Sequence, residues 1–436
     1  MTVRPPLVES VSEDVTAPRP ERAGGRRRRG PFLYLALLGP GLIAANAGND
    51  AGGIATYSSV GASFGYGLLW ALILITISLA LVQEMAARMG ATTGKGFAEL
   101  VREEMGVRVT AFVMATLLIA NAGLVVAEFA GIGAAAELFG VSRYAVIPPM
   151  AFLLWWLVTR GSYQRVEKVF LALSLVFFAY PVTAFLAGPD WAEVGREIVR
   201  PTFRLDADYL TLFVALVGTT ITPYMQLYLQ SSVAERGADA GETRVDAYAG
   251  AVFSDVIAGF IIIVTGSTLF LTGTRVETAA DAARALGPLA GSYAPFVFGL
   301  GLFGASMLAG AVLPLATAYT VTEAFGFEKG VSRTFREAPV FLGLFTGLIA
   351  VGAGVALLPG LNVIDLLVST QLLNGLLLPV VLVSILRLVN DREVMGRRTN
   401  GRVYNVIAWA TVAAVVLLSF LYLVITVLGL VGVTVG

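Results

Sequence analysis

The 436-residue sequence contains no cysteine and no histidine. The first absence excludes disulfide bonds and thiolate metal ligands, and the second excludes imidazole ligands and histidine proton relays. Charged residues are also scarce, at 14% of the chain, whereas hydrophobic residues make up 57%. With a mean hydropathy of +0.79, the chain is expected to be an all-α protein that crosses a membrane several times.

Eleven apolar stretches are expected to form transmembrane helices. The first, about Phe32 to Val60, follows a tail at residues 1–30 that is polar and expected to be disordered. The others are Tyr66–Arg88, Thr110–Phe139, Tyr144–Val158, Val169–Leu186, Tyr209–Val233, Ala247–Leu271, Tyr293–Phe325, Pro339–Leu358, Val363–Leu386 and Val403–Val433. With a cytoplasmic N-terminus, 24 of the 30 Lys and Arg residues lie inside. This bias predicts a plasma-membrane protein whose C-terminus is extracellular.

A carboxylate interrupts the first apolar stretch. Asp50 lies near its middle, and Gly48, Gly52 and Gly53 beside it weaken the helix and let the backbone expose its carbonyl groups. A charge at this depth in a bilayer is costly and typically marks an ion or substrate pathway. The alternative is that Asp50 only pairs with a neighbouring helix.

The sixth stretch contains a second interruption, because Pro223 removes a helical hydrogen bond and should open the backbone at Thr222. A simple proline kink is the alternative. The two interrupted stretches each begin a set of five, at residues 31–188 and 207–388, with an extra helix at residues 403–433. This arrangement predicts one transporter domain over residues 31–436, built as a 5+5 inverted repeat with its site between broken helices 1 and 6.

Other polar residues fall inside the apolar stretches. Gln371 and Asn374 share one face of the tenth helix, and Glu128 and Asp255 are acids in the third and seventh. Each could line a pathway or form a structural contact with another helix. Asn49, beside Asp50, is a further candidate. No nucleophile–base pair or nucleotide-binding motif indicates an enzyme.

Several segments resemble the Nramp (natural-resistance-associated macrophage protein) transporters. The similarity includes the run from Gly39 to Ala44 that leads to Asp50, the triplet around Glu128, the proline break of the sixth stretch, and Thr370-Gln371. It implies a LeuT-type fold that carries divalent cations, typically manganese or iron, together with protons. The metal is then a substrate, and no cofactor is expected.

The sequence departs from the family pattern at its metal ligands. Gly53 stands where the family has a ligand Asn, and Thr222 and Tyr224 replace its Met and His. Val125 stands where the family has a second acid three residues before Glu128. These departures resemble the Nramp-related magnesium transporters. The loss of sulfur also removes a preference for softer metals, and Mg²⁺ commonly binds through one or two carboxylates while keeping several waters.

The function expected from these observations is uptake of largely hydrated Mg²⁺, with Mn²⁺ as a second candidate, by alternating access. The membrane potential would drive it without protons. A monomer is expected, with the divalent cation and the bilayer, but no nucleic acid, as partners. The expected metal site comprises Asp50, Gly53, Ala47, Thr219, Thr222 and Gln371, and the candidate pathway residues are Asn49, Tyr224, Met225, Glu128, Asn374 and Asp255.

Three other functions remain open on the sequence alone. The main alternative is a proton-coupled Mn²⁺/Fe²⁺ transporter with altered ligands. A sodium-coupled carrier of small organic substrates could use the same architecture, although a carboxylate-binding amino-acid site would not retain Asp50. A non-transporting sensor is the last, although such proteins usually carry a long soluble signalling domain. Comparing the uptake of different cations distinguishes these possibilities.

Overall fold

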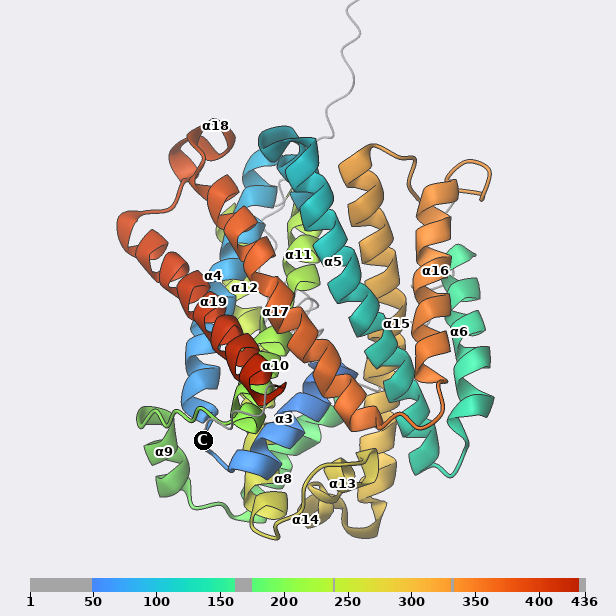
Figure 1. Ribbon diagram of the computed structural model, residues 1–436, viewed down its shortest axis with the longest axis vertical. Coiled ribbons are helices and arrows are strands. Elements are labelled where there is room, and N and C mark those ends of the chain that lie inside the picture. Colours follow the sequence, from blue (N-terminus) through green and yellow to red (C-terminus); the bar gives the residue numbers. More distant parts are fainter. Residues whose placement is uncertain (1–48, 161–174, 238–239, 331–332, 431–436) are drawn as a thin grey trace, which may run out of the picture. The chain divides into compact units, whose positions relative to one another are not determined.

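A computed structural model describes residues 49–160, 175–237, 240–330 and 333–430. In these ranges every secondary-structure element is a helix (Figure 1). The α-helices are α3 (Ala51–Phe64), α4 (Leu69–Thr93), α5 (Phe97–Leu138), α6 (Arg143–Thr159), α8 (Ala179–Ala187), α9 (Trp191–Val199), α10 (Ala207–Thr220), α11 (Pro223–Arg236), α12 (Ala240–Thr265), α13 (Ala279–Arg284), α14 (Gly287–Ala290), α15 (Ala294–Phe325), α16 (Pro339–Ala356), α17 (Val363–Asn390), α18 (Arg392–Met395) and α19 (Arg402–Leu430). Four short elements join them: η2 (Leu175–Phe178), the π-helical η3 (Gly266–Phe270), η4 (Gly291–Tyr293) and η5 (Gly396–Arg398).

The described part of the chain contains 8 helical segments that are long and apolar enough to cross a membrane. A shorter apolar helix, α6, coincides with the expected fourth span. The expected first, fifth and last spans fall partly outside the described residues, and the N-terminal tail lies wholly outside them. The count of eleven spans therefore stays a prediction, whereas the all-helical, multi-pass character is confirmed.

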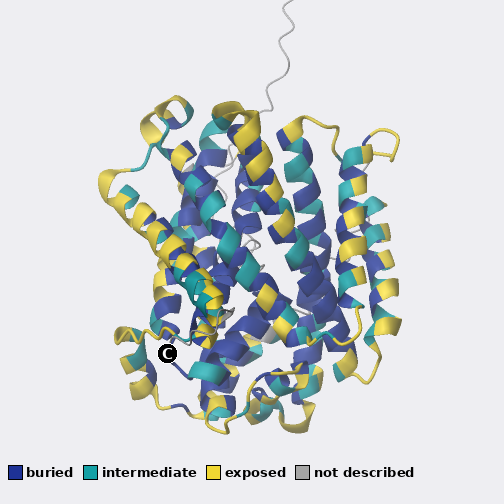
Figure 2. Ribbon diagram, viewed as in Figure 1, coloured by how far each residue is buried: buried dark blue, intermediate teal, exposed yellow. Residues whose placement is uncertain are grey.

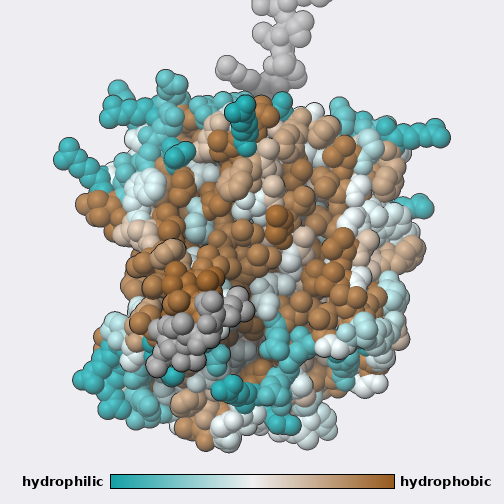
Figure 3. Space-filling view, in the orientation of Figure 1, coloured by the Kyte–Doolittle hydropathy of each residue, from teal (hydrophilic) through white to brown (hydrophobic). Residues whose placement is uncertain are grey.

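The surface of the helical bundle carries a hydrophobic band between more hydrophilic ends on the face shown in Figure 3. The last helix, α19, is the least buried of the 8 candidate spans, since only 22% of its most apolar 18-residue stretch is buried. Phe420 and Leu423 of this helix are exposed, and much of its ribbon carries the colour of exposed residues in Figure 2. Because large exposed apolar surfaces are rare on water-soluble monomers, this band is the surface that faces lipid.

The broken helices lie at the centre of the bundle. Within α3, every residue from Ala51 to Ala62 is buried, and 94% of the most apolar window of residues 207–235 is buried. The helical ribbon stops after Thr220 and resumes at Pro223. Thr222 adopts an extended backbone, as expected before a proline, and Pro223 occupies the first helical turn, where its missing N–H costs nothing. The predicted break in the sixth span is confirmed.

Small residues bring α10 and α17 together beside this break. A Cβ atom added to Gly218 would overlap the backbone of Gln371 and Gly375 on α17. One added to Gly375 would overlap the carbonyl oxygen of Val214 on α10. The two helices therefore touch backbone to backbone, which is the packing that glycine permits between membrane helices. This contact fixes Gln371 next to the broken helix.

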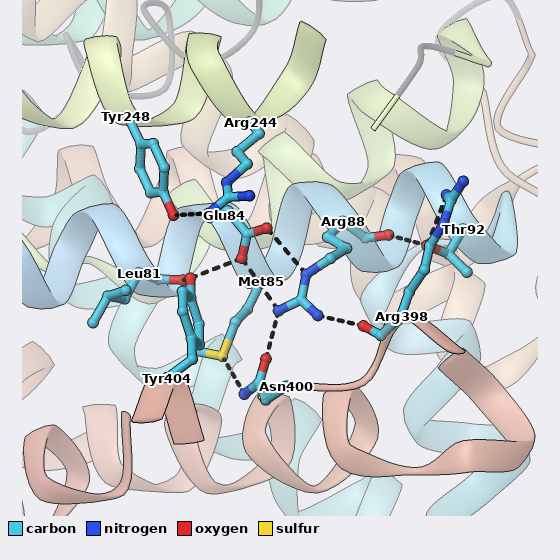
Figure 4. A network of polar contacts seen from close by, with 10 residues as sticks. All are labelled: Leu81, Glu84, Met85, Arg88, Thr92, Arg244, Tyr248, Arg398, Asn400 and Tyr404. Carbon is cyan, nitrogen blue, oxygen red and sulfur yellow. Dashed lines mark hydrogen bonds and ion pairs between the residues drawn. The ribbon is translucent and has the colours of Figure 1, made fainter. Parts of the chain in front are cut away.

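A polar network fastens the C-terminal elements to α4 (Figure 4). The Arg88 guanidinium donates to Glu84 Oε1 at 3.0 Å, to Asn400 Oδ1 at 2.5 Å, and to the carbonyl oxygen of Arg398. The Tyr404 hydroxyl on α19 donates to Glu84 Oε2 at 2.7 Å. Because the carboxylate of Glu84 is almost fully buried, this network compensates a charge that would otherwise be costly.

Replacing the central arginine of this network should destabilise the protein. We expect Arg88→Ala to lower the free energy of unfolding by about 3 kcal/mol, because Glu84 loses a charged donor within a buried site. Thermal unfolding in detergent measures the effect. Arg397→Ala, which removes an exposed arginine from the neighbouring η5, is the control and should change little. Equal stability of the two variants would contradict a structural role for the network.

Candidate metal site

Asp50 caps the first described helix and keeps one carboxylate oxygen unused. Its backbone is extended, and α3 begins at the next residue. Oδ1 accepts the Gly53 N–H at 2.6 Å and the Gln371 side-chain amide at 3.2 Å. The first contact is a helix N-cap, which satisfies a backbone donor. The residue is 2% exposed, and Oδ2 has no hydrogen-bond partner among the described residues.

No positive side chain compensates this carboxylate within the described ranges. None of the seven ion pairs found there includes Asp50, Glu128 or Asp255. Nor do the described residues contain three acidic side chains placed to hold one metal ion together. A buried carboxylate without a counter-charge is expensive. Asp50 is therefore a buried carboxylate surrounded by neutral oxygens, without a counter-charge from the described residues.

Gln371 is the second member of the site, supplied by α17. It is fully buried, and its Oε1 has no hydrogen-bond partner in the described part of the chain. The side chain lies directly on Gly52, where a Cβ atom would overlap the Gln371 amide. Because Gly52 has no side chain, the amide can reach Asp50. The unused oxygens of Asp50 and Gln371 thus belong to two groups already joined by a hydrogen bond.

The sixth-helix residues lie at the end of α10. The Thr222 hydroxyl donates to the Thr219 carbonyl at 2.6 Å and lies 3.3 Å from that of Gly218. The Thr222 hydroxyl and the Thr219 carbonyl each keep a lone pair for a further contact. The Tyr57 hydroxyl of α3 contacts the side chains of Thr219 and Thr220, which ties the two half-helices together. Ala47, also expected at the site, lies outside the described residues.

Two asparagines on the site's own segments connect it to neighbouring helices. The Asn49 amide donates to the Ser254 hydroxyl of α12 at 3.3 Å. The Asn374 amide donates to the Gly218 carbonyl at 2.7 Å, so it supports the last turn of α10. The Oδ1 atom of each has no hydrogen-bond partner among the described residues. Asn374 therefore supports the broken backbone of α10, Asn49 ties the start of α3 to α12, and each retains a buried acceptor oxygen.

The remaining pathway candidates divide into two groups. Glu128 is fully buried on α5, faces the Ala51 N–H and the Ser306 hydroxyl, and interacts electrostatically with Asp50. Tyr224 interacts with both of these acids, and the buried Met225 follows it in sequence. These residues belong to the neighbourhood of Asp50.

Asp255 lies on the part of α12 that faces α4, away from this neighbourhood. It lines an apolar cavity of about 250 Å³ together with Leu72 and Thr76 of α4 and Ile198 of α9. Thr76 is its side-chain partner. Its link to the site is electrostatic and runs through Tyr57, which interacts with both Asp255 and Asp50.

A polar cavity that the sequence did not reveal lies beside the end of α3 and the first turns of α10 and α17. Its volume is about 690 Å³, and it extends inward as far as Ser59 of α3 and Ser369 of α17. Acids outnumber bases in its lining, with Asp206, Asp208, Glu277 and Asp365 against Arg204 and Arg275. A second cavity of about 630 Å³ shares Glu277 and Asn362 with it. A net negative cleft concentrates cations.

Comparisons with known proteins agree with this architecture. The family model of Nramp, described as natural resistance-associated macrophage protein-like, matches residues 41–426. A manganese transporter from Eremococcus coleocola, solved with an aromatic bis-isothiourea substituted compound, is 19% identical with a TM-score of 0.70, over 90% of this chain and 87% of that chain. MhsT in complex with L-phenylalanine is 16% identical with a TM-score of 0.56, over 89% of this chain and 98% of that chain. A nucleobase-cation-symport-1 family transporter, Mhp1, in a closed conformation is 15% identical with a TM-score of 0.53, over 88% of this chain and 92% of that chain. The LeuT-type fold is confirmed.

Proposed function

The chain belongs to the Nramp family of divalent metal transporters, and on that premise we propose that it takes up Mg²⁺ through the site at Asp50. Mn²⁺ is a second candidate substrate. The family consists of transporters rather than enzymes. The metal is therefore the transported substrate, and the protein needs no cofactor. The observation that supports the proposal most is the unused, uncompensated carboxylate oxygen of Asp50 beside the unused amide oxygen of Gln371.

The ligand chemistry supports a hard, hydrated cation. Gly53 offers no side-chain ligand, and Thr222 and Tyr224 supply hydroxyl oxygens rather than sulfur or imidazole. One carboxylate and a few neutral oxygens match the coordination of Mg²⁺, which keeps several of its waters. A softer metal such as Mn²⁺ or Cd²⁺ would gain little from this site relative to Mg²⁺.

The acidic cavity supports a route to the site from one side. With a cytoplasmic N-terminus, this cavity opens to the extracellular solution, where its acids would raise the local concentration of divalent cations. The broken helices would then alternate access to the site, as in other inverted-repeat transporters. An inside-negative plasma membrane would draw the cation inward.

Cation uptake into proteoliposomes tests the proposed function. We expect Mg²⁺ and Mn²⁺ to enter at comparable concentrations and Ca²⁺ to enter poorly, because the site does not supply the many oxygen ligands that Ca²⁺ takes. The transporter should not strongly prefer Cd²⁺ over these ions, since no sulfur is proposed as a ligand. Uptake of Mn²⁺ or Cd²⁺ without any uptake of Mg²⁺ would refute magnesium as the substrate.

Transport should proceed without proton movement. The whole chain has no histidine, and Val125 stands where the family has a second acid, so Glu128 alone remains of that proton route, and one carboxylate does not make a relay. A divalent ion gains about 4.6 kcal/mol on crossing about 100 mV, which supports a gradient on the order of a thousandfold. Proteoliposomes that hold a pH-sensitive dye should therefore take up Mg²⁺ at constant internal pH.

One observation supports the proton-coupled alternative. Glu128 is buried and interacts electrostatically with Asp50, so it is the residue through which a proton would travel. Internal acidification that requires Mg²⁺ or Mn²⁺ and disappears in Glu128→Gln would establish this alternative and contradict transport driven by voltage alone.

A further inference from the structure

Three buried glutamines on α4 and α11 lack hydrogen-bond partners that their burial demands. Gln83, Gln226 and Gln230 are each at most 1% exposed. Within the described residues, neither amide atom of Gln83 or Gln226 has a partner, and Gln230 Oε1 has none. A buried polar group without a partner is destabilising, and native interiors contain few of them. Residues retained at this cost commonly serve water or a ligand.

Helix geometry places the three side chains in one interface. Gln226 and Gln230 are four residues apart and so share a face of α11. That face lies against α4, because a Cβ on Gly90 of α4 would overlap the Gln230 carbonyl, and the Gln230 amide donates to the Lys95 carbonyl at 3.2 Å. Gln83 precedes Gly90 by seven residues, which is nearly two full turns. It therefore lies on the same face of α4.

The glutamines continue a line that starts at the candidate metal site. Thr222 begins α11, and Gln226 and Gln230 follow it at intervals of four residues. At a rise of 1.5 Å per residue, each step is about 6 Å, so the row extends about 12 Å beyond the break. It ends at Lys95, whereas the acidic cavity lies at the other end, where α10 begins.

We infer that Gln83, Gln226 and Gln230 form a second cation site, through which the transported divalent ion leaves Asp50 toward the Lys95 end of the bundle. This inference rests on the proposed function. Amide oxygens can accept hydrogen bonds from the waters of a hydrated cation. Because they carry no charge, they bind it weakly enough for release, which is what conduction through successive sites requires. The row is closed in the present arrangement and would open when α11 moves away from α4.

Leucine substitutions separate transport from structure. Leucine has a similar size but no polar atoms, so Gln226→Leu and Gln83→Leu remove unpartnered groups and should leave the unfolding temperature unchanged or raised. Mg²⁺ uptake should fall about tenfold, the factor that corresponds to about 1.4 kcal/mol, while Mg²⁺ binding to the purified protein through Asp50 stays unchanged. Wild-type uptake in both variants, or lost uptake together with a lowered unfolding temperature, would overturn the inference.

The absence of native cysteine allows a direct second test. In Gln226→Cys, millimolar Mg²⁺ should slow modification by a positively charged methanethiosulfonate reagent. Leu227→Cys, at a buried position on another face of α11, should show no such protection. Equal effects at both positions would contradict a cation site at Gln226. If the wild type transports no divalent cation, the proposed function itself fails, which is a result distinct from failure of the exit site alone.

Discussion

Asp50→Ala should abolish divalent cation uptake while the protein still folds. The substitution removes the only carboxylate at the break of the first helix and leaves the cation with neutral oxygens. Removing an uncompensated charge from the membrane interior relieves about 2.5–3.5 kcal/mol on insertion scales. That gain offsets the loss of the α3 N-cap, which costs about 1 kcal/mol. Uptake into proteoliposomes, with the fold checked by gel filtration, measures the result.

Asp50→Asn distinguishes the charge from the cap. Asparagine caps helices as well as aspartate does, so this variant keeps the hydrogen bond to Gly53 and loses only the charge. It should be as inactive as Asp50→Ala. Glu393→Gln removes an exposed acid from α18 and should transport normally. Wild-type Mg²⁺ uptake in a well-folded Asp50→Ala protein would refute the assignment of the site.

Restoring the family's ligands should change the metal preference. Gly53→Asn adds an amide oxygen beside Asp50, and Thr222→Met adds a thioether at the start of α11. Because sulfur favours softer ions, the double variant should bind Cd²⁺ or Mn²⁺ about tenfold more tightly relative to Mg²⁺, a difference of about 1.4 kcal/mol.

Calorimetric titration of the purified wild type, each single variant and the double variant measures this preference. The single variants serve as controls, because each adds one ligand without the other. Tight Cd²⁺ binding by the wild type, unaffected by millimolar Mg²⁺, would show that its native ligands already favour soft metals. The magnesium interpretation would then be wrong.

The sequence predicted those features that depend on one residue's own chemistry. Pro223 cannot continue a helix from the preceding turn, and the structure breaks at the residue before it. The long apolar runs likewise predicted the membrane helices, because their composition alone makes them more stable in lipid than in water. Resemblance to the Nramp family placed Asp50 and Gln371 in one expected site, which local chemistry could not do. The hydrogen bond that joins these two side chains across 321 residues was not predicted.

Features that depend on the register between helices could not be predicted. The three glutamines attract no notice in the sequence, because they become a group only when Gly90 lets α11 lie directly on α4. The acidic cavity similarly combines loops that are distant in the chain. Asp255 was a candidate for the pathway by its depth alone, and the side of α12 on which it lies depends on packing against α4.

The most direct test of Mg²⁺ transport through the Asp50 site is a competition experiment. Uptake of trace Mn²⁺ into proteoliposomes with an inside-negative potential is followed while external Mg²⁺ is raised to millimolar concentrations. Because Mg²⁺ and Mn²⁺ are expected to bind the Asp50 site with comparable, weak affinities, millimolar Mg²⁺ should suppress Mn²⁺ uptake in the wild type. Asp50→Asn should show no Mn²⁺ uptake at all. Mn²⁺ uptake that persists unchanged at millimolar Mg²⁺ would contradict the account.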